Sequence, residues 1–259
     1  MMELIWDLEK YNAAIYRYDS LLGKDYFHWV EELEEVDFKE LKNLEKERAI
    51  LEQNTRAFLQ KDAGVNVLLW GARGCGKSSL AKAIFTKFIK EGLKVLQIFK
   101  EDLKALPKIV DCLRQKKAKF IIFCDDLSFE EGEDYKALKS VLEGSIEKFP
   151  KNILIYATSN KKHLMRENNE ENDLFGFMGN DDKISLSDRF PIALGFYAYG
   201  AKEYLEILQE EFKKGNFSGY EWEEVSKIAL NYATKRGSKN PRIAKQFCEL
   251  YQSGLLEFI

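Results

Sequence analysis

An apolar run, a glycine-rich turn and a helical pattern follow one another without interruption between residues 65 and 88, and few folds accommodate that order. Val65–Trp70 has the composition of a buried strand, residues 71–78 read Gly-Ala-Arg-Gly-Cys-Gly-Lys-Ser, and the helical pattern begins at Ser79. The loop is a complete Walker A sequence. Strand, loop and helix together predict a phosphate-binding loop at the carboxyl end of a parallel sheet.

Each part of this loop has an expected role toward a nucleotide. The glycines permit a tight turn that brings backbone N–H groups against phosphate oxygens, Lys77 supplies a cation at the β- and γ-phosphates, and the Ser78 hydroxyl can ligate Mg²⁺. The helix adds the positive end of its dipole. The expected nucleotide-binding residues here are Gly71, Gly74, Cys75, Gly76, Lys77, Ser78 and Ser79.

Strand-like and helix-like segments alternate after residue 64, which predicts an α/β fold with a five-stranded parallel sheet, the P-loop core. The expected strands are Val65–Trp70, Lys94–Phe99, Lys119–Cys124, Asn152–Ala157 and Ile192–Phe196. Helices alone are expected downstream, at about Ala201–Lys214, Trp222–Lys235 and Pro241–Leu255. The aromatic-rich first 60 residues also have a mostly helical pattern. We therefore expect three parts: a helical N-terminal extension (1–60), a nucleotide-binding core (61–200) and a helical domain (201–259).

A second motif, Phe120-Ile121-Ile122-Phe123-Cys124-Asp125-Asp126, is a hydrophobic strand that ends in two carboxylates. This is a Walker B arrangement, and alone it could also be a surface turn. Asp125 is expected to hold Mg²⁺ directly or through water, and Asp126 to orient or deprotonate the attacking water. Asp126 is one methylene shorter than the Glu common at this position in hydrolytic P-loop proteins, so hydrolysis could be slow, or Glu130 or Glu131 could share the role.

The third motif follows the expected strand Asn152–Ala157, which leads into Thr158, Ser159 and Asn160. Asn160 is expected to sense the terminal phosphate or the attacking water, although an Asn after a strand is often only a turn residue. Position 163 is His, where a guanine-specific Asn-Lys-x-Asp sequence requires Asp. The sequence therefore disfavours a GTPase.

Charge and composition bound the remaining possibilities. The chain has 259 residues and a net charge of −3, so its overall charge gives no reason to expect nucleic acid, although a local basic patch is compatible with it. No stretch approaches 18 consecutive apolar residues, and the first seven residues are acidic where a signal peptide is basic. We therefore expect a cytoplasmic protein with no membrane partner.

The series of motifs resembles the AAA+ ATPases, from about Leu41 to Phe247. It is most similar to a bacterial AAA+ family labelled only as a domain of unknown function. Five segments carry this likeness: Asn-Val-Leu-Leu-Trp-Gly (66–71), Phe-Cys-Asp-Asp-Leu-Ser-Phe-Glu (123–130), Tyr-Ala-Thr-Ser-Asn (156–160), Ser-Leu-Ser-Asp-Arg-Phe (185–190) and the segment around Arg242.

The resemblance implies roles for two arginines that spacing leaves ambiguous. Arg189 matches the arginine finger that reaches the γ-phosphate held by a neighbouring subunit, and Arg242 matches the sensor-2 arginine of the helical lid. Guanidinium groups suit both positions because they stay charged and clamp phosphate oxygens.

Some positions depart from the family pattern. Cys75 stands where Thr is usual, so that a redox role is conceivable but a tolerated small side chain is the preferred interpretation. Leu41 and Asn43 occupy the approximate position of a hydrophobic-Gly linker that packs on adenine. Residues 100–103 lack an aromatic-Gly pore loop, so protein unfolding is not supported.

These observations predict an ATPase that binds ATP and Mg²⁺ at the junction of core and lid. Asp126, Asn160 and Arg189 are the expected catalytic residues, Ser78 and Asp125 the metal ligands, and Arg242 a further nucleotide contact. The expected partner is a second copy of the chain in a homo-oligomer. Two alternatives are an ATP-gated binding module with little turnover and a nucleic-acid loader or remodeller. A small-molecule kinase is a weaker one.

Overall fold

The computed structural model describes residues 4–127, 136–143, 146–160 and 189–258. Residue contacts divide the chain into two compact units, which are described separately. Unit 1 contains residues 1–70 and 78–195, and unit 2 contains residues 71–77 and 196–259. The phosphate-loop residues 71–77 thus belong to the same unit as the C-terminal helices.

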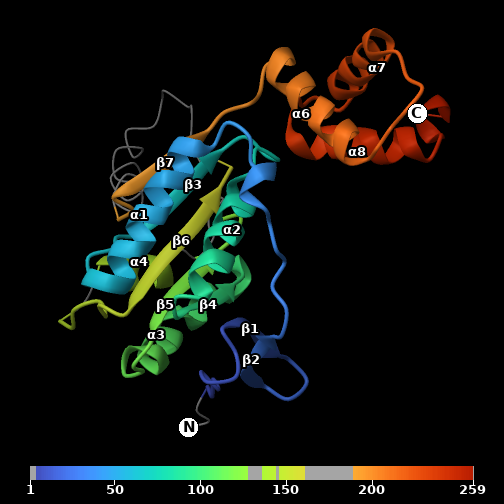
Figure 1. The fold of residues 1–259 in the computed structure, drawn as a ribbon. Helices are drawn as coiled ribbons and strands as arrows, with labels where there is room; N and C mark the ends of the chain where they lie inside the picture. The colour runs from blue at the N-terminus through green and yellow to red at the C-terminus, as the bar shows by residue number, and fades with distance from the viewer. Residues whose placement is uncertain (1–3, 128–135, 144–145, 161–188, 259) are drawn as a thin grey trace, which may run out of the picture. The chain divides into compact units, whose positions relative to one another are not determined.

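Unit 1 is built on a sheet that runs in the order β2-β1-β4-β5-β6-β3-β7, with seven strands in the described part of the chain (Figure 1). The strands are β1 (Ala13–Asp19), β2 (Lys24–Val30), β3 (Val67–Gly71), β4 (Leu93–Ile98), β5 (Lys119–Cys124), β6 (Ile153–Ser159) and β7 (Ile192–Phe196). Strand β4 pairs in parallel with β5, β5 with β6, and β6 with β3. The five predicted strands are all present, within two residues at each end.

The prediction of a five-stranded sheet was wrong, and so was the helical prediction for residues 13–30, which form two strands; residues 45–61 are helical as predicted. Strand β1 pairs antiparallel with β2 and parallel with β4, so this hairpin extends the sheet at its β4 edge. Alternate hairpin residues face the core: Ala14, Tyr16 and Phe27 are buried, and Phe27 packs 5.5 Å from Trp6. The period of two, which is typical of a strand, explains why a helical reading failed.

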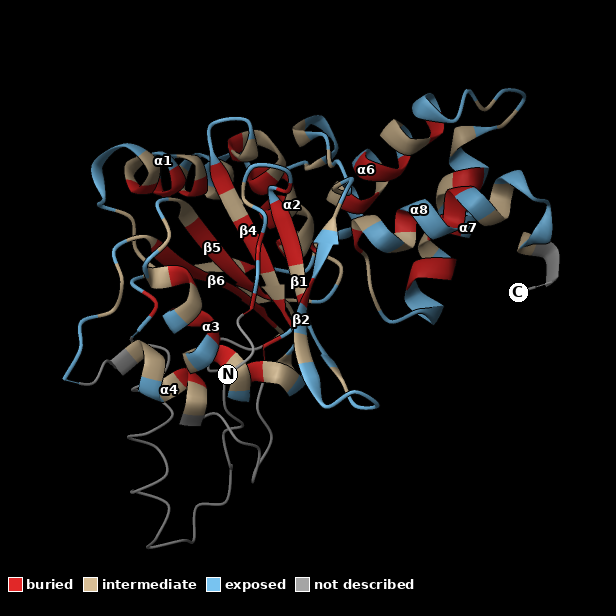
Figure 2. Ribbon diagram, turned by 90° about the horizontal axis from the view of Figure 1, so that it is seen from below, coloured by how far each residue is buried: buried red, intermediate tan, exposed pale blue. Residues whose placement is uncertain are grey.

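Helices cover both faces of this sheet, and its strands form the buried centre in Figure 2. Helices α1 (Glu45–Lys61) and α2 (Lys77–Ile89) lie on one face, where Phe85 contacts the rings of Phe123 and Tyr156. Helices α3 (Leu106–Arg114) and α4 (Lys136–Glu143) lie on the other face. Continuous apolar strands such as β5 and β6 are expected where a parallel sheet is covered on both sides.

Unit 2 contains helices α6 (Ala201–Lys214), α7 (Trp222–Lys235) and α8 (Pro241–Gln252), followed by a short 3₁₀ turn at Leu255–Phe258. Their apolar faces enclose a separate core centred on Phe212, whose ring stacks 4.5 Å from Phe217 and contacts Tyr251. The three predicted C-terminal helices are therefore confirmed, with α8 ending three residues early. The predicted domain limits stay predictions.

Among the described helices, none combines the length and the apolar composition needed to cross a membrane.

Candidate nucleotide-binding site

Three side chains from different elements of unit 1 meet directly after the phosphate loop. The Ser78 hydroxyl, in the first turn of α2, donates to Asp125 Oδ1 at 2.6 Å. The Thr158 hydroxyl, near the end of β6, donates to the same oxygen at 2.6 Å. Thr158 is buried and Asp125 is half-buried. The structure therefore brings together the two residues predicted to ligate Mg²⁺.

These oxygens suit a magnesium ion. Mg²⁺ is usually held in nucleotide sites by one or two protein oxygen ligands together with substrate phosphates and water. A hydroxyl and a carboxylate already in contact supply such a pair. When bound, the ion would neutralise charge on the β- and γ-phosphate oxygens.

Asp126 and Asn160 lie on the neighbouring strand ends and are also in contact. Asn160 Nδ2 donates to Asp126 Oδ1 at 2.6 Å, and the Asp126 backbone N–H donates to Thr158 Oγ1 at 2.9 Å. Asp126 has a φ of 55°, in the left-handed region that Asp tolerates better than most residues. This turn presents the Asp126 side chain on the surface while the preceding Asp125 stays half-buried.

Sequence reasoning did not single out Thr158. Its hydroxyl joins both carboxylate positions, since it donates to Asp125 and accepts from the Asp126 backbone. The signal available in the sequence was a small polar residue at the end of an otherwise apolar strand, in register with Leu69 of β3. Only the pairing of β6 between β5 and β3 shows that this position faces Asp125.

In unit 2, the phosphate loop has the backbone that its glycines predict. Gly71, Gly74 and Gly76 all have positive φ angles, of 127°, 75° and 92°. A Cβ on Gly71 would lie 2.0 Å from the carbonyl oxygen of Phe196, which accepts a hydrogen bond from Ala72 N–H at 2.8 Å. Only glycine fits at position 71.

Lys77 is buried, and its ammonium group donates to the carbonyl oxygens of Gly71 at 2.8 Å and Ala72 at 2.9 Å. The cation is thus folded back over its own loop. Ser79 is half-buried in the first turn of α2. Arg242 is exposed in the first turn of α8, which belongs to the same unit as the loop.

Cys75 is buried within the loop, and its burial raises the pKa of the thiol although nearby Lys77 acts to lower it. A reactive cysteine needs a lowered pKa and exposure, and Cys75 has neither. The structure favours the prediction of a tolerated small side chain at this position.

Arg189 lies far from Asp125 within unit 1. Its carbonyl oxygen accepts a hydrogen bond from Asn66 Nδ2 at 3.4 Å, and Ile192 N–H donates to the Asn66 carbonyl oxygen. Arg189 therefore lies near the amino-terminal ends of strands β3 and β7. Asp125 follows the carboxyl end of β5, and so lies at the opposite end of the parallel strands. Strands of five residues span about 16 Å. Arg189 is exposed, and the structure does not bring it to the Ser78–Asp125 pair.

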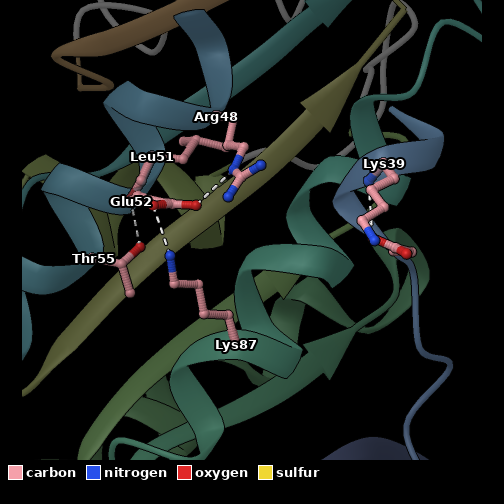
Figure 3. Close-up of polar contacts among 7 residues, drawn as sticks. Lys39, Arg48, Leu51, Glu52, Thr55 and Lys87 are labelled. Atoms are coloured by element: carbon pink, nitrogen blue, oxygen red, sulfur yellow. Dashed lines mark hydrogen bonds and ion pairs between the residues drawn. The ribbon is translucent and has the colours of Figure 1, made fainter. Parts of the chain in front are cut away.

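Helix α1, which follows the segment around Leu41 and Asn43, is joined to α2 by an ion pair. Figure 3 shows Glu52 between Arg48 and Lys87, and both cations lie 2.7 Å from its carboxylate oxygens. Burial alone would raise the pKa of Glu52, but hydrogen bonds from Lys87 and Arg48 lower it below its ordinary value of 4.5. Arg48 also lies 4.0 Å from the ring centroid of Phe38.

Within this segment, Asn43 has a φ of 58°, a conformation in which glycine is common and Asn is tolerated. Asn43 is thus in a conformation that glycine also adopts readily. Leu41 is half-buried nearby. Glu130, Glu131 and His163 lie outside the described residues.

The solved structures with a similar fold include AAA+ ATPases. The ORC1 protein of Aeropyrum pernix, solved in complex with DNA, has a TM-score of 0.59 and 16% sequence identity over 80% of this chain and 59% of that one. The ORC2 protein of the same organism, solved as ADPNP-ADP complexes, has a TM-score of 0.50 and 14% identity over 80% and 68% of the two chains. The chain thus spans 59% of the length of ORC1.

A search of curated proteins found no match. The model of one protein family matches residues 10–255, and its description is "Protein of unknown function (DUF815)". That match covers nearly the whole sequence and agrees with the AAA+ fold. The chain therefore belongs to the DUF815 family, with the fold of an AAA+ ATPase.

Proposed function

We propose that this protein is an ATPase that binds ATP and Mg²⁺ at the phosphate loop and uses hydrolysis to change the conformation of an assembly. The observation that carries the proposal is the 2.6 Å hydrogen bond between Ser78 and Asp125. It joins the last residue of the Walker A sequence to the first carboxylate of the Walker B strand. The loop N–H groups and Lys77 would bind the phosphates, and Ser78 and Asp125 would hold the ion.

Hydrolysis would use Asp126 and Asn160. The Asp126 carboxylate would accept a hydrogen bond from the attacking water, and Asn160 would fix its direction of attack on the γ-phosphate. Their present 2.6 Å contact places both groups at one point of the surface. Thr158 positions the turn that carries Asp126 through the backbone hydrogen bond.

We further propose that the active form is a homo-oligomer in which Arg189 acts on the nucleotide of a neighbouring subunit. Support comes from the position of Arg189, which is exposed and lies at the amino-terminal ends of the strands, whereas Asp125 lies at their carboxyl ends. Arg242 would contact nucleotide from α8, which carries it in the same unit as the loop.

Subunit mixing tests this arrangement. Arg189→Ala and Lys77→Ala should each be inactive alone. A mixed assembly should recover part of the ATPase activity, because some sites combine an intact loop with an intact neighbouring Arg189. Failure of every mixture to recover activity would contradict an arginine supplied by the neighbour.

A second candidate function is an ATP-gated binding module with little turnover. The hydrogen bond between Asn160 and Asp126 favours it, because each side chain expected to position water is engaged by the other. Asn160→Ala separates the two candidates. The variant should lose turnover if Asn160 positions water, and should gain turnover if Asn160 restrains Asp126.

Nucleic acid is a further proposed partner, since the similar ORC1 structure contains DNA. The net charge of −3 does not favour it. ATPase activity stimulated by DNA and weakened steeply by salt would support this role.

A further inference from the structure

Within unit 2, a buried asparagine at the start of helix α8 contacts the phosphate loop. Asn240 Nδ2 donates to the carbonyl oxygen of Arg73 at 2.9 Å and to Ser238 Oγ at 2.7 Å. Its Oδ1 accepts from the backbone N–H of Ile243 at 2.9 Å, and so caps helix α8. Only 5% of Asn240 is exposed, so water does not compete for these bonds. One amide group therefore joins the loop to the helix that carries Arg242.

The bond to Arg73 fixes the direction of a second group. The carbonyl of Arg73 and the N–H of Gly74 belong to one planar trans peptide, and they point in opposite directions. While Asn240 holds the carbonyl on its own side, the Gly74 N–H must point away from Asn240. Backbone N–H groups of such a loop are the groups that bind phosphate oxygens.

The Gly74 backbone and the Asn240 side chain lie in close contact. A Cβ on Gly74 would lie 2.5 Å from Asn240 Nδ2, and Gly74 has a φ of 75°. Glycine at position 74 is thus needed because Asn240 is packed directly against it. The absence of a side chain at Gly74 leaves room for the Asn240 amide beside the Arg73 carbonyl.

We propose that Asn240 is a positioning residue for nucleotide binding, which orients the Gly74 N–H toward a bound phosphate and links the occupancy of the loop to helix α8. The proposal rests on the proposed function, since it assumes that the loop binds a nucleotide. The contact lies within unit 2 and does not depend on the side chains of Arg189 and Arg242.

Two substitutions at this position test the role. Asn240→Ser is neutral and keeps an oxygen that caps α8, but lacks the amide that reaches Arg73. Asn240→Asp keeps the shape and the cap, and places an oxygen where the donor was. Ser238→Ala is the matched control, because it removes the other partner of the same amide and leaves the Arg73 bond intact.

The measurement is the affinity of the full chain for a fluorescent ATP analogue, followed by displacement with ATP, ADP and adenosine. Loss of one orienting hydrogen bond should lower the affinity for ATP and for ADP by about tenfold in both Asn240 variants. Affinity for adenosine, which has no phosphate, should stay within about twofold, as should all affinities of Ser238→Ala. Asn240→Ser decides, because Asn240→Asp also brings a negative charge close to the phosphates. If Asn240→Ser lowers the melting temperature, the affinities are compared at a temperature at which circular dichroism shows the variant folded.

The proposal is overturned if both Asn240 variants bind ATP with the affinity of the wild type. It is also overturned if Ser238→Ala lowers the affinity for ATP as much as they do. Lys77→Ala is measured in parallel to separate the two levels of inference. ATP binding that survives Lys77→Ala contradicts the proposed function itself. Binding that needs Lys77 but is unaffected in both Asn240 variants contradicts only the role of Asn240.

Discussion

Replacing Thr158 by Val removes one hydroxyl and nearly preserves the volume of the side chain. That hydroxyl makes two hydrogen bonds, one to the Asp125 carboxylate at 2.6 Å and one from the Asp126 N–H at 2.9 Å. A bond to a charged group contributes about 1.5 to 3 kcal/mol and a neutral one about 1 kcal/mol. Since no cavity forms, and since water can reach the exposed Asp126, the free energy of unfolding should fall by about 2 to 3 kcal/mol.

Urea denaturation followed by circular dichroism measures this change, and Thr158→Ser is the control. Serine keeps the hydroxyl and loses a methyl group, so it should cost only about 1 kcal/mol. The Val variant should also need more Mg²⁺ for ATP binding, because Thr158 no longer holds Asp125 against Ser78. A Val variant within about 0.5 kcal/mol of the wild type, or less destabilised than Thr158→Ser, would refute this account of the cluster.

Two further predictions concern the framework of unit 1. Phe27→Ala should lower the free energy of unfolding by about 3 to 5 kcal/mol, because Phe27 is buried against Trp6 in the core; a loss under 1 kcal/mol would show that the hairpin is not part of the cooperative sheet. Glu52→Gln should be less stable than the wild type at neutral pH, and this difference should shrink as the pH falls below 4.5. A carboxylate whose pKa is lowered in the folded protein stabilises the fold at pH values above its ordinary pKa. This stabilisation is lost as the pH falls through the lowered pKa of the folded state. Urea titrations of both proteins from pH 7 to pH 3 would contradict the Glu52 assignment if the difference stayed constant.

The sequence predicts well the parts of the fold that have a regular apolar pattern. Strands β5 and β7 have the predicted limits, and β3, β4 and β6 differ by one or two residues. An unbroken apolar run such as residues 120–124 leaves little choice of structure once the flanking segments are helical. Helices α6 and α7 also have their predicted limits, because an apolar stripe with helical spacing and glycine-containing joints defines both ends.

The N-terminal hairpin was not predicted because its pairing partner is distant. Strand β1 pairs with β4, about 80 residues later in the chain, and local aromatic content does not reveal that contact. The alternation of Ala14, Tyr16, Phe27 and Trp29 was the available local signal. A strand at the edge of a sheet is specified by its register with the neighbouring strand as much as by its own residues.

In the candidate site too, some contacts follow from sequence motifs and others depend on segments that are distant in the chain. The Ser78–Asp125 contact follows from two motifs and the rule that parallel strands end at one edge of a sheet. The contacts of Thr158 and Asn240 depend on strand register and on the packing of the loop against a segment 167 residues away. No local pattern encodes either contact.

The measurement that tests the central claim most directly is steady-state ATP turnover per subunit over a wide range of protein concentration, with Lys77→Ala as the blank. An ATPase that acts as an assembly, with Arg189 supplied by a neighbour, should show turnover that rises with concentration and disappears in the blank. Turnover that stays at the level of the blank at every concentration would contradict the claim that this protein hydrolyses ATP as an oligomer.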